Sequence, residues 1–386
     1  MASSGKTPRK AAPGSAKQAV AKAPSKTAKV AKAAPAAGPV TLAEAKAIAM
    51  AKQPKAAARA VRKAVAPPAS PAAVGIERKK LRAEQRKEIA RRVREYKATM
   101  TIMKQRGARR SPSKAPAKVP AKARRGGPVA KGDGGGFVPL QIVAEGDSWF
   151  DYPVPFFGGG IIPRLEDRLG VPILNLAKAG DEVRYMLGVE ERIRLSDVLN
   201  SGCPAGGPWD VLLFSGGGND IVDNPMALWV KDFDATIPAA AHLHPARFAT
   251  ALGLVRAGYE DLIALRDRLS PTTHLVFQGY DFAIPSGHGI CHLGPWLKPT
   301  FDLRGFPSLA AAQPVVTAML QQFAQMLTSL ATAPGVNNVT FINGQGTLRP
   351  QLSSWHNELH PSRSGFDLFA DLFQTKLKAL FPTRVQ

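Results

Sequence analysis

Short apolar runs alternate with amphipathic stretches throughout residues 137–386. Apolar runs bounded by Gly, Pro, Asp or Asn are typical of buried strands, and apolar residues spaced by three and four predict helices. The expected strands are 141–145, 171–176, 210–214, 274–278 and 339–342. The expected helices are 163–169, 182–199, 245–269, 310–331 and 364–381. This alternation predicts an α/β fold, a three-layer α/β/α sandwich around a five-stranded parallel sheet.

The residues before this region follow a different pattern. Residues 1–75 are mostly Ala, Lys and Pro with almost no large apolar side chains, which predicts a disordered arm with at most transient helix. A basic helix is expected over 76–107, because apolar residues recur there at alternating spacings of four and three: Ile89, Val93, Tyr96, Met100 and Met103. This seam suits either weak self-association through 89–103 or docking onto the following domain. Residues 108–136 are rich in Pro, Lys and Gly and predict a flexible linker.

Charge separates the two parts of the chain. The formal net charge is +23, but residues 1–136 alone carry 34 Lys and Arg against 6 Asp and Glu, a surplus of +28. The remaining residues carry 18 basic and 23 acidic side chains, a net charge of −5. Such a basic arm is either a solvated tail or a binding site for DNA or another polyanion. Binding would be independent of sequence, because residues 1–75 contain no aromatic side chain that could stack on bases.

Cysteine content and hydropathy exclude several classes of protein. Cys203 and Cys291 are the only cysteines and form no CxxC pair, so neither a disulfide framework nor a thiolate zinc site is expected. The N-terminus has no apolar segment of the length that a signal peptide needs, and no run approaches the roughly 18 apolar residues of a membrane span. We therefore expect a cytoplasmic protein without a transmembrane segment.

Candidate chemistry begins at the end of the strand expected over 141–145. Gly146 breaks this apolar run and leaves Ser148 just past the carboxyl end of the strand, where parallel α/β sheets bind their ligands. A serine hydroxyl becomes a nucleophile when a base and donors for an oxyanion lie nearby. Three later stretches offer such groups: 175–180, 215–220 and 355–361. Taken singly, each is also consistent with an N-cap serine, a turn glycine or a packed histidine.

In these four stretches the chain resembles the SGNH (GDSL-type) hydrolases, a family of serine esterases and lipases. The Gly-Asp-Ser run that ends at Ser148 matches the first block of the family, and the Gly-Gly-Asn-Asp run that contains Asn219 matches the third. The resemblance covers residues 137–386 and implies a flavodoxin-like strand order. It implies that Ser148 is the nucleophile and His360 the general base. It also implies that the Ser148 N–H, the Gly180 N–H and the Asn219 side chain donate to the oxyanion.

The chain departs from the family pattern at one position. Most relatives carry Asp three residues before the histidine, whereas this chain has Asn357. The side-chain oxygen of Asn357 can orient His360 without supplying a charge, and Glu358 is the alternative orienting group. The run from His356 to His360 reads His-x-Glu-x-His, which is not the zinc motif His-Glu-x-x-His, so no metal is expected. The resemblance implies no organic cofactor.

The predicted function is hydrolysis of a carboxylic ester of a small molecule, lipid or carbohydrate through an acyl-enzyme on Ser148. The alternatives are a carbohydrate deacetylase, a thioesterase, or a polyanion-binding protein with a catalytically weak hydrolase domain. Aromatic-rich loops are expected over 221–244 and 280–307, where they would either wall a substrate site or pack on themselves. Because every block follows Phe137, a chain that starts near this residue is expected to fold and act alone.

Overall fold

The computed structural model describes residues 38–51, 71–109, 137–152, 159–290 and 294–385, without the side chains of 71–79 and 81. These residues belong to a compact unit that spans Gly38–Gln386. Most of the basic arm and of the expected linker lies outside the described residues. The expected disorder and polyanion binding of those segments therefore stay predictions, and Cys291 also lies outside the described residues.

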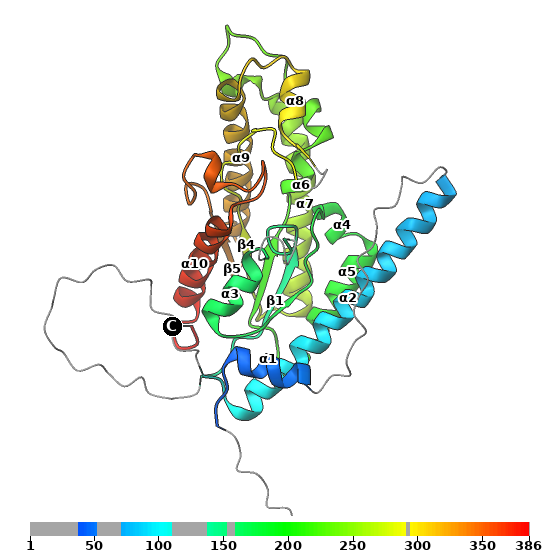
Figure 1. The fold of residues 1–386 in the computed structure, drawn as a ribbon, viewed down its shortest axis with the longest axis vertical. Coiled ribbons are helices and arrows are strands. Elements are labelled where there is room, and N and C mark those ends of the chain that lie inside the picture. The colour runs from blue at the N-terminus through cyan, green and yellow to red at the C-terminus, as the bar shows by residue number, and fades with distance from the viewer. Residues whose placement is uncertain (1–37, 52–70, 110–136, 153–158, 291–293, 386) are drawn as a thin grey trace, which may run out of the picture. The chain divides into compact units, whose positions relative to one another are not determined.

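A parallel sheet of five strands forms the centre of the unit (Figure 1). The strand order is β2-β1-β3-β4-β5. Its strands are β1 Ile142–Gly146, β2 Ile173–Asn175, β3 Val211–Ser215, β4 His274–Gln278 and β5 Val339–Ile342. Every residue of β1 and β3 is buried, as expected for central strands that are covered on both faces. The predicted α/β fold with a five-stranded parallel sheet is thus confirmed, and each strand lies close to its expected position.

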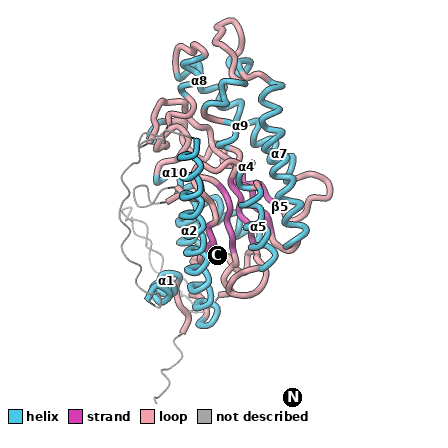
Figure 2. Tube along the Cα trace, turned by 90° about the vertical axis from the view of Figure 1, so that its right-hand side faces the viewer, coloured by secondary structure: helices cyan, strands magenta, loops and turns pink. Residues whose placement is uncertain are grey.

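Helices cover both faces of the sheet. Figure 2 shows α10 on one side of the strands and α5 and α7 on the other. On the first side α3 packs against α10, and on the second α7 packs against both α5 and α9. The bounds are α3 Ile161–Leu169, α4 Val183–Met186, α5 Val189–Ser201, α6 Gly218–Ile221, α7 Pro245–Leu269, α8 Lys298–Leu303, α9 Leu309–Ala331 and α10 Arg363–Leu380. Short 3-10 turns occur at Asn224–Leu228, Ala239–His242 and Leu352–Ser354.

The helix expected over 182–199 is two helices in the structure. Helix α4 ends at Met186, and α5 begins at Val189. Gly188 between them has an extended backbone, with φ −70° and ψ 171°, and serves as the N-cap of α5. Two acidic residues in the first turn of α5, Glu190 and Glu191, favour a helix start at this point because they complement the helix dipole.

Part of the segment expected to be disordered forms a packed helix in the structure, α1 Leu42–Ala51. Its start carries a reciprocal cap, in which the Thr41 N–H donates to the Glu44 carboxylate at 2.7 Å and the Glu44 N–H donates to the Thr41 hydroxyl at 3.3 Å. Its apolar face buries Leu42 against a cluster that includes Met103 of the following helix. The sequence of the arm alone predicts at most transient helix here, because it does not reveal the α2 residues that α1 packs against.

The expected basic helix is present as α2 Pro71–Arg106, which starts five residues earlier than predicted. Its apolar seam packs on the same chain. Tyr96 and Met100 are buried in the main core, and the Tyr96 ring lies 5.6 Å from the ring of Trp209. The docking alternative is therefore the one that the structure contains, and self-association through 89–103 stays a prediction.

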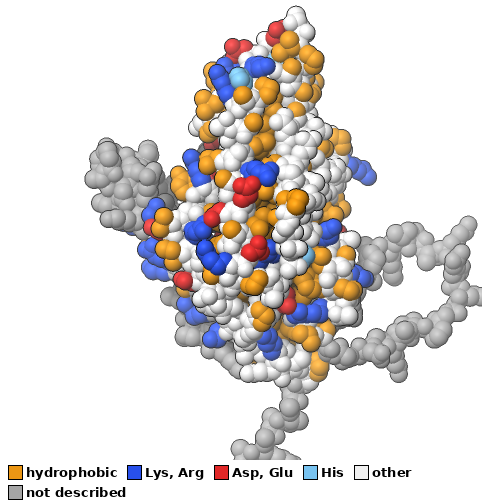
Figure 3. Space-filling view, turned by 180° about the vertical axis from the view of Figure 1, so that it is seen from behind, with side chains coloured by type: hydrophobic (Ala, Val, Ile, Leu, Met, Phe, Trp, Pro, Cys, Tyr) orange, Lys and Arg blue, Asp and Glu red, His pale blue; other side chains and the backbone are white. Residues whose placement is uncertain are grey.

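Charged side chains of both signs are interspersed with apolar ones on the face shown in Figure 3. This mixture agrees with the small net charge of residues 137–386. Among the described residues, no helix is both long and apolar enough to cross a bilayer.

Candidate active site

The turn after β1 presents Ser148 at the carboxyl edge of the sheet. The side chain of Asp147 holds this turn, because its Oδ1 accepts hydrogen bonds from the Trp149 N–H and the Ser215 hydroxyl, both at 2.9 Å. The Tyr280 hydroxyl donates to its other oxygen. Burial raises the pKa of Asp147 to about 6, and these hydrogen bonds oppose the rise. Ser148 itself is only 8% exposed.

His360 lies directly against Ser148. Its Nε2 is 2.6 Å from the Ser148 hydroxyl oxygen, and its Nδ1 is 2.9 Å from Oδ1 of Asn357. The oxygen of Asn357 also accepts from the backbone N–H groups of Leu359 and His360, at 2.9 Å each. Because an amide oxygen only accepts, Nδ1 carries the ring hydrogen and Nε2 is left free to take a proton from Ser148.

Tyr152 supports this pair from behind, and the sequence patterns did not indicate it. Its hydroxyl accepts from the amide nitrogen of Asn357 at 3.2 Å and lies 2.7 Å from Nδ1 of His356. Its ring packs on the His360 ring, with centroids 4.5 Å apart. Its position four residues after Ser148 was the only available signal. Tyr152 therefore fixes Asn357 as well as the plane of the His360 ring.

The surroundings of His360 keep its ring neutral. Burial, with a smaller contribution from the charge of His356, lowers the pKa of His360 to about 3. A ring with such a pKa carries no charge at neutral pH in the resting protein. The Nε2 atom beside Ser148 is therefore unprotonated and able to accept a hydrogen bond from the Ser148 hydroxyl over the whole neutral range.

Asn219 shares the same pocket. Gly217 before it has φ 98°, and a Cβ there would come within 2.7 Å of the Phe323 ring, so the turn requires glycine. The Asn219 amide nitrogen donates to the Asp181 carbonyl at 2.8 Å, which uses one of its two hydrogens. Asn219 lines a pocket together with Ser148 and His360.

Gly180, like Asn357, is a predicted site residue that does not line this pocket. It occupies an exposed turn with φ 82°, immediately before Asp181. Within the described part of the chain, neither its N–H nor that of Ser148 donates to another protein group. The structure thus brings Ser148, Asn219, His360 and Asn357 together, and Gly180 follows in the neighbouring loop.

Glu358 points away from the His360 ring. Its carboxylate is fully buried and accepts four backbone N–H groups, those of Gly287, Trp296, Leu297 and Lys298, at 2.6–3.0 Å. Of the two candidates, Asn357 is therefore the one that contacts the His360 ring. Glu358 instead anchors the loop that precedes α8. Among the described residues, no group of three or more His, Cys, Asp or Glu side chains is arranged to hold a metal ion.

Replacing Glu358 with Gln should lower the melting temperature of the protein. The amide of the variant side chain keeps only one acceptor oxygen. Its NH₂ group would face backbone N–H groups, which are also donors. A loss of about 3 kcal/mol is expected, because hydrogen bonds to charged groups contribute about 1.5–3 kcal/mol each. This loss corresponds to roughly 6–12 °C in a domain of this size. Thermal unfolding followed by circular dichroism would measure it.

Glu260→Gln is the matched control for this change. Glu260 is half exposed and pairs with Arg256 one turn away on α7, so its loss should change stability by less than about 1 kcal/mol. Equal melting temperatures for the two variants would show that the buried carboxylate does not anchor the loop.

The rest of the pocket is apolar and narrow. Its free volume is about 40 Å³, and its apolar lining comprises Ile221, Val222, Ala283, Leu297, Val316, Met319, Leu320 and Leu359. The two long loops therefore supply part of the wall. Most of their aromatic rings pack on neighbours instead: Trp229 on Phe248, and Phe233 on His242 and Phe306. Both sequence-based expectations for these loops hold in part.

The chain was compared with known proteins. No protein-family model matches it, and no curated protein does. Similar solved structures include a lipase from a goat rumen metagenome, with 17% identity and a TM-score of 0.39 over 64% of this chain and 100% of that one. An extracellular lipase from Streptomyces rimosus has 16% identity and a TM-score of 0.38 over 61% and 99% of the chains. The family 3 carbohydrate esterase of Clostridium thermocellum has 15% identity and a TM-score of 0.35 over 63% and 99%. Lipases and esterases are thus among the solved structures that the chain resembles.

Proposed function

We propose that this protein is a serine hydrolase that cleaves carboxylic esters through an acyl-enzyme on Ser148. One observation carries the proposal, the 2.6 Å contact between the Ser148 hydroxyl and Nε2 of a buried His360 whose Nδ1 is held by Asn357. A nucleophile, a base and an orienting group in line are the arrangement that activates a serine.

The reaction would proceed in two halves. The Ser148 hydroxyl attacks the ester carbonyl while its proton passes to Nε2 of His360. The tetrahedral oxyanion is held by the Asn219 amide and by the N–H groups of Ser148 and Gly180. His360 then returns the proton to the leaving alcohol, and an acyl group remains on Ser148. Water, deprotonated by His360, releases this group as a carboxylic acid.

The size of the pocket favours short acyl groups. A free volume of about 40 Å³ equals the room of roughly three water molecules, which matches an acetyl or propionyl group. The apolar lining suits the methyl or methylene end of such a group. Acetyl esters are therefore the preferred substrates in this proposal. Carbohydrate deacetylation and thioester hydrolysis use the same chemistry and differ only in the leaving group.

Covalent labelling of the full chain tests the proposal. A fluorophosphonate probe, which reacts with activated serines, should modify the protein at one site, and peptide mass spectrometry should locate the probe on Ser148. p-Nitrophenyl acetate should be hydrolysed faster than the octanoate ester. Absence of labelling at Ser148 in folded protein that also fails to hydrolyse the acetate would refute the proposal.

Asn357 should affect turnover through the orientation of His360. Asn357→Ala removes the acceptor at Nδ1 and should lower kcat about 10-fold or more. Asn357→Asp restores a charged acceptor, so kcat should be retained or raised. The new charge should raise the pKa of His360 from its low value, which moves the acidic limb of the kcat/KM profile to higher pH. Rate measurements from pH 4 to 8 would reveal both effects, because the wild-type limb near pH 3 lies below this window and a raised pKa brings the limb into it.

The control for the Asn357 series is Glu358→Gln, which perturbs the adjacent residue. This variant should lower the melting temperature and leave the acidic limb where the wild type has it. If the limb moves in Glu358→Gln and stays unchanged in Asn357→Asp, the orienting role belongs to Glu358.

A further inference from the structure

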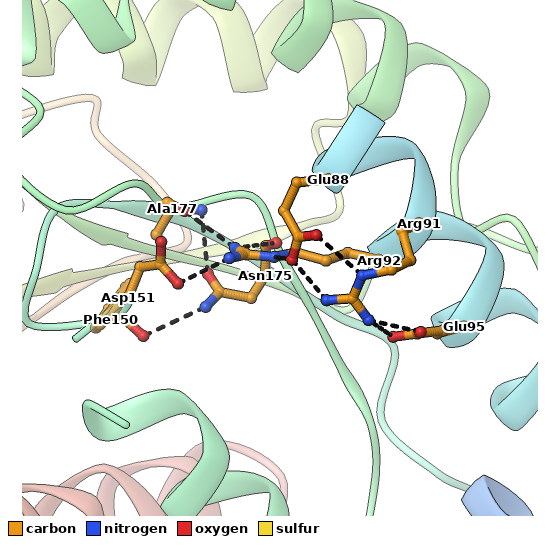
Figure 4. Close-up of polar contacts among 8 residues, drawn as sticks. All are labelled: Glu88, Arg91, Arg92, Glu95, Phe150, Asp151, Asn175 and Ala177. Carbon is orange, nitrogen blue, oxygen red and sulfur yellow. Dashed lines mark hydrogen bonds and ion pairs between the residues drawn. The ribbon is translucent and has the colours of Figure 1, made fainter. Parts of the chain in front are cut away.

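Arg92 of helix α2 reaches the two loops that follow β1 and β2 (Figure 4). One guanidinium nitrogen donates to the Asp151 carboxylate at 2.8 Å. The other donates to two backbone carbonyls, those of Asn175 at 3.2 Å and Ala177 at 3.1 Å. Arg92 thus joins a helix from the N-terminal segment to two loops at the carboxyl edge of the sheet.

Contacts within helix α2 also hold the Arg92 side chain in place. Nε of Arg92 lies 3.2 Å from the carboxylate of Glu88, one turn earlier on α2. Ile89 and Val93 on the same helix pack against the main core, which fixes the helix on the domain. The Arg92 side chain is 21% exposed, so most of it is shielded from water. A planar guanidinium can satisfy several acceptors at once from such a fixed position, whereas a lysine ammonium cannot match that geometry.

Both loops carry groups of the proposed catalytic site. Asp151 follows Ser148 by three residues, and Ala177 precedes Gly180 by three. The side chain of Asn175 adds a second connection, because its amide donates to the Phe150 carbonyl at 3.3 Å and its oxygen accepts from the Ala177 N–H at 3.0 Å. The backbone of Ala179, next to Gly180, favours the charged form of Asp151 and so opposes the rise in pKa that burial causes. The nucleophile loop and the glycine loop are therefore held together by one cluster that is centred on Arg92.

We propose that Arg92 positions the Gly180 N–H relative to the Ser148 hydroxyl, so that helix α2 is a working part of the catalytic site. The proposal rests on the proposed esterase function. A displaced Gly180 would still allow the substrate to bind, because Gly180 does not line the acyl pocket. It would weaken the stabilisation of the oxyanion, which exists only after attack has begun. The predicted consequence is a loss in kcat rather than in substrate affinity.

The test compares Arg92→Ala and Arg92→Lys with wild type in the full chain. With p-nitrophenyl acetate, kcat should fall about 10- to 100-fold in both variants, and KM should change less than about 3-fold. The inhibition constant of ethylboronic acid, which forms a tetrahedral adduct on an active serine, should rise in proportion to the loss of kcat/KM. Arg92→Lys keeps the charge and the docked helix, so it answers the question even where Arg92→Ala fails to fold.

Arg91→Ala is the matched control. Arg91 is adjacent on α2 but pairs with Glu88 and Glu95 of the same helix, at 2.5–2.9 Å (Figure 4). Its loss should leave kcat within about 2-fold, because exposed pairs along a helix contribute little. Asp151→Asn should reproduce the kcat defect of Arg92→Lys, and the double variant should be no worse than the more damaging single one.

The outcomes separate the two proposals. Folded Arg92→Lys with wild-type kcat and boronate inhibition overturns the positioning role and leaves the esterase proposal intact. A KM increase without loss of kcat also overturns it. If Ser148→Ala hydrolyses the acetate as fast as the wild type does, the proposed esterase mechanism is overturned. The positioning role of Arg92 then falls with it.

Discussion

Ser148→Ala should lower the kcat for p-nitrophenyl acetate by roughly three to six orders of magnitude, because the proposed acyl-enzyme forms on this hydroxyl. The side chain lies 2.6 Å from its base and is nearly buried, so the change removes one oxygen and leaves the packing in place. The melting temperature should therefore stay within a few degrees of wild type. Steady-state kinetics and thermal unfolding on the same samples would measure both quantities.

His360→Ala should be about as damaging, and the double variant should be little worse than either single one. The two groups act on one proton, so once either is missing the other contributes almost nothing. Near-normal hydrolysis in Ser148→Ala would rule out the acyl-enzyme. Full additivity, with the double variant slower by the product of the two losses, would show that the two residues act in separate steps.

A chain that begins at Phe137 should fail to form the native domain. Such a chain lacks α2, whose Tyr96 and Met100 are 3% and 0% exposed within the main core. Burial of large apolar side chains contributes about 1.5–3 kcal/mol each. Loss of these two residues alone removes about 3–6 kcal/mol, which is comparable with the lower end of the roughly 5–15 kcal/mol by which domains are stable. Circular dichroism and dye binding should report a partly unfolded protein with exposed apolar surface.

A chain that begins at Gly38 is the control, because it keeps α1 and α2. It should melt within a few degrees of the full protein and retain its esterase activity. The sequence alone predicted the opposite result for the Phe137 chain, since all four blocks lie downstream of that residue. If the Phe137 chain melts cooperatively and has wild-type activity, the N-terminal helices are not required for the fold or for the activity.

The sheet and its main helices could be predicted from the sequence because their signals are local. Strand β4 was placed at its observed bounds, since central parallel strands appear as uninterrupted apolar runs between turn residues. The seam of α2 was equally visible as a period of three and four. The residues that cover this seam could not be predicted from the sequence. Trp209, for example, packs on Tyr96 although the two are more than a hundred positions apart.

The candidate site divides in the same way. Ser148, Asn219 and His360 could be proposed because each lies in a short recognisable block. Tyr152, Tyr280 and Arg92 could not, because each acts through a hydrogen bond to a residue that is distant in the sequence. Glu358 was recognised only as a possible partner of His360. Its four backbone contacts depend on a loop whose path no local pattern records.

Glu358 holds that loop in a way that allows the side chains of the loop to change during evolution. Its carboxylate binds main-chain N–H groups, which every residue except proline provides. The side chains of Trp296, Leu297 and Lys298 can therefore be exchanged without loss of these hydrogen bonds, and Leu297 lines the pocket beside Ser148. Selection, or a randomised library, can alter the fit for a new acyl group at these positions while the attachment point two residues from the base stays fixed. Residues of this loop can thereby change substrate preference while the proposed catalytic residues stay the same.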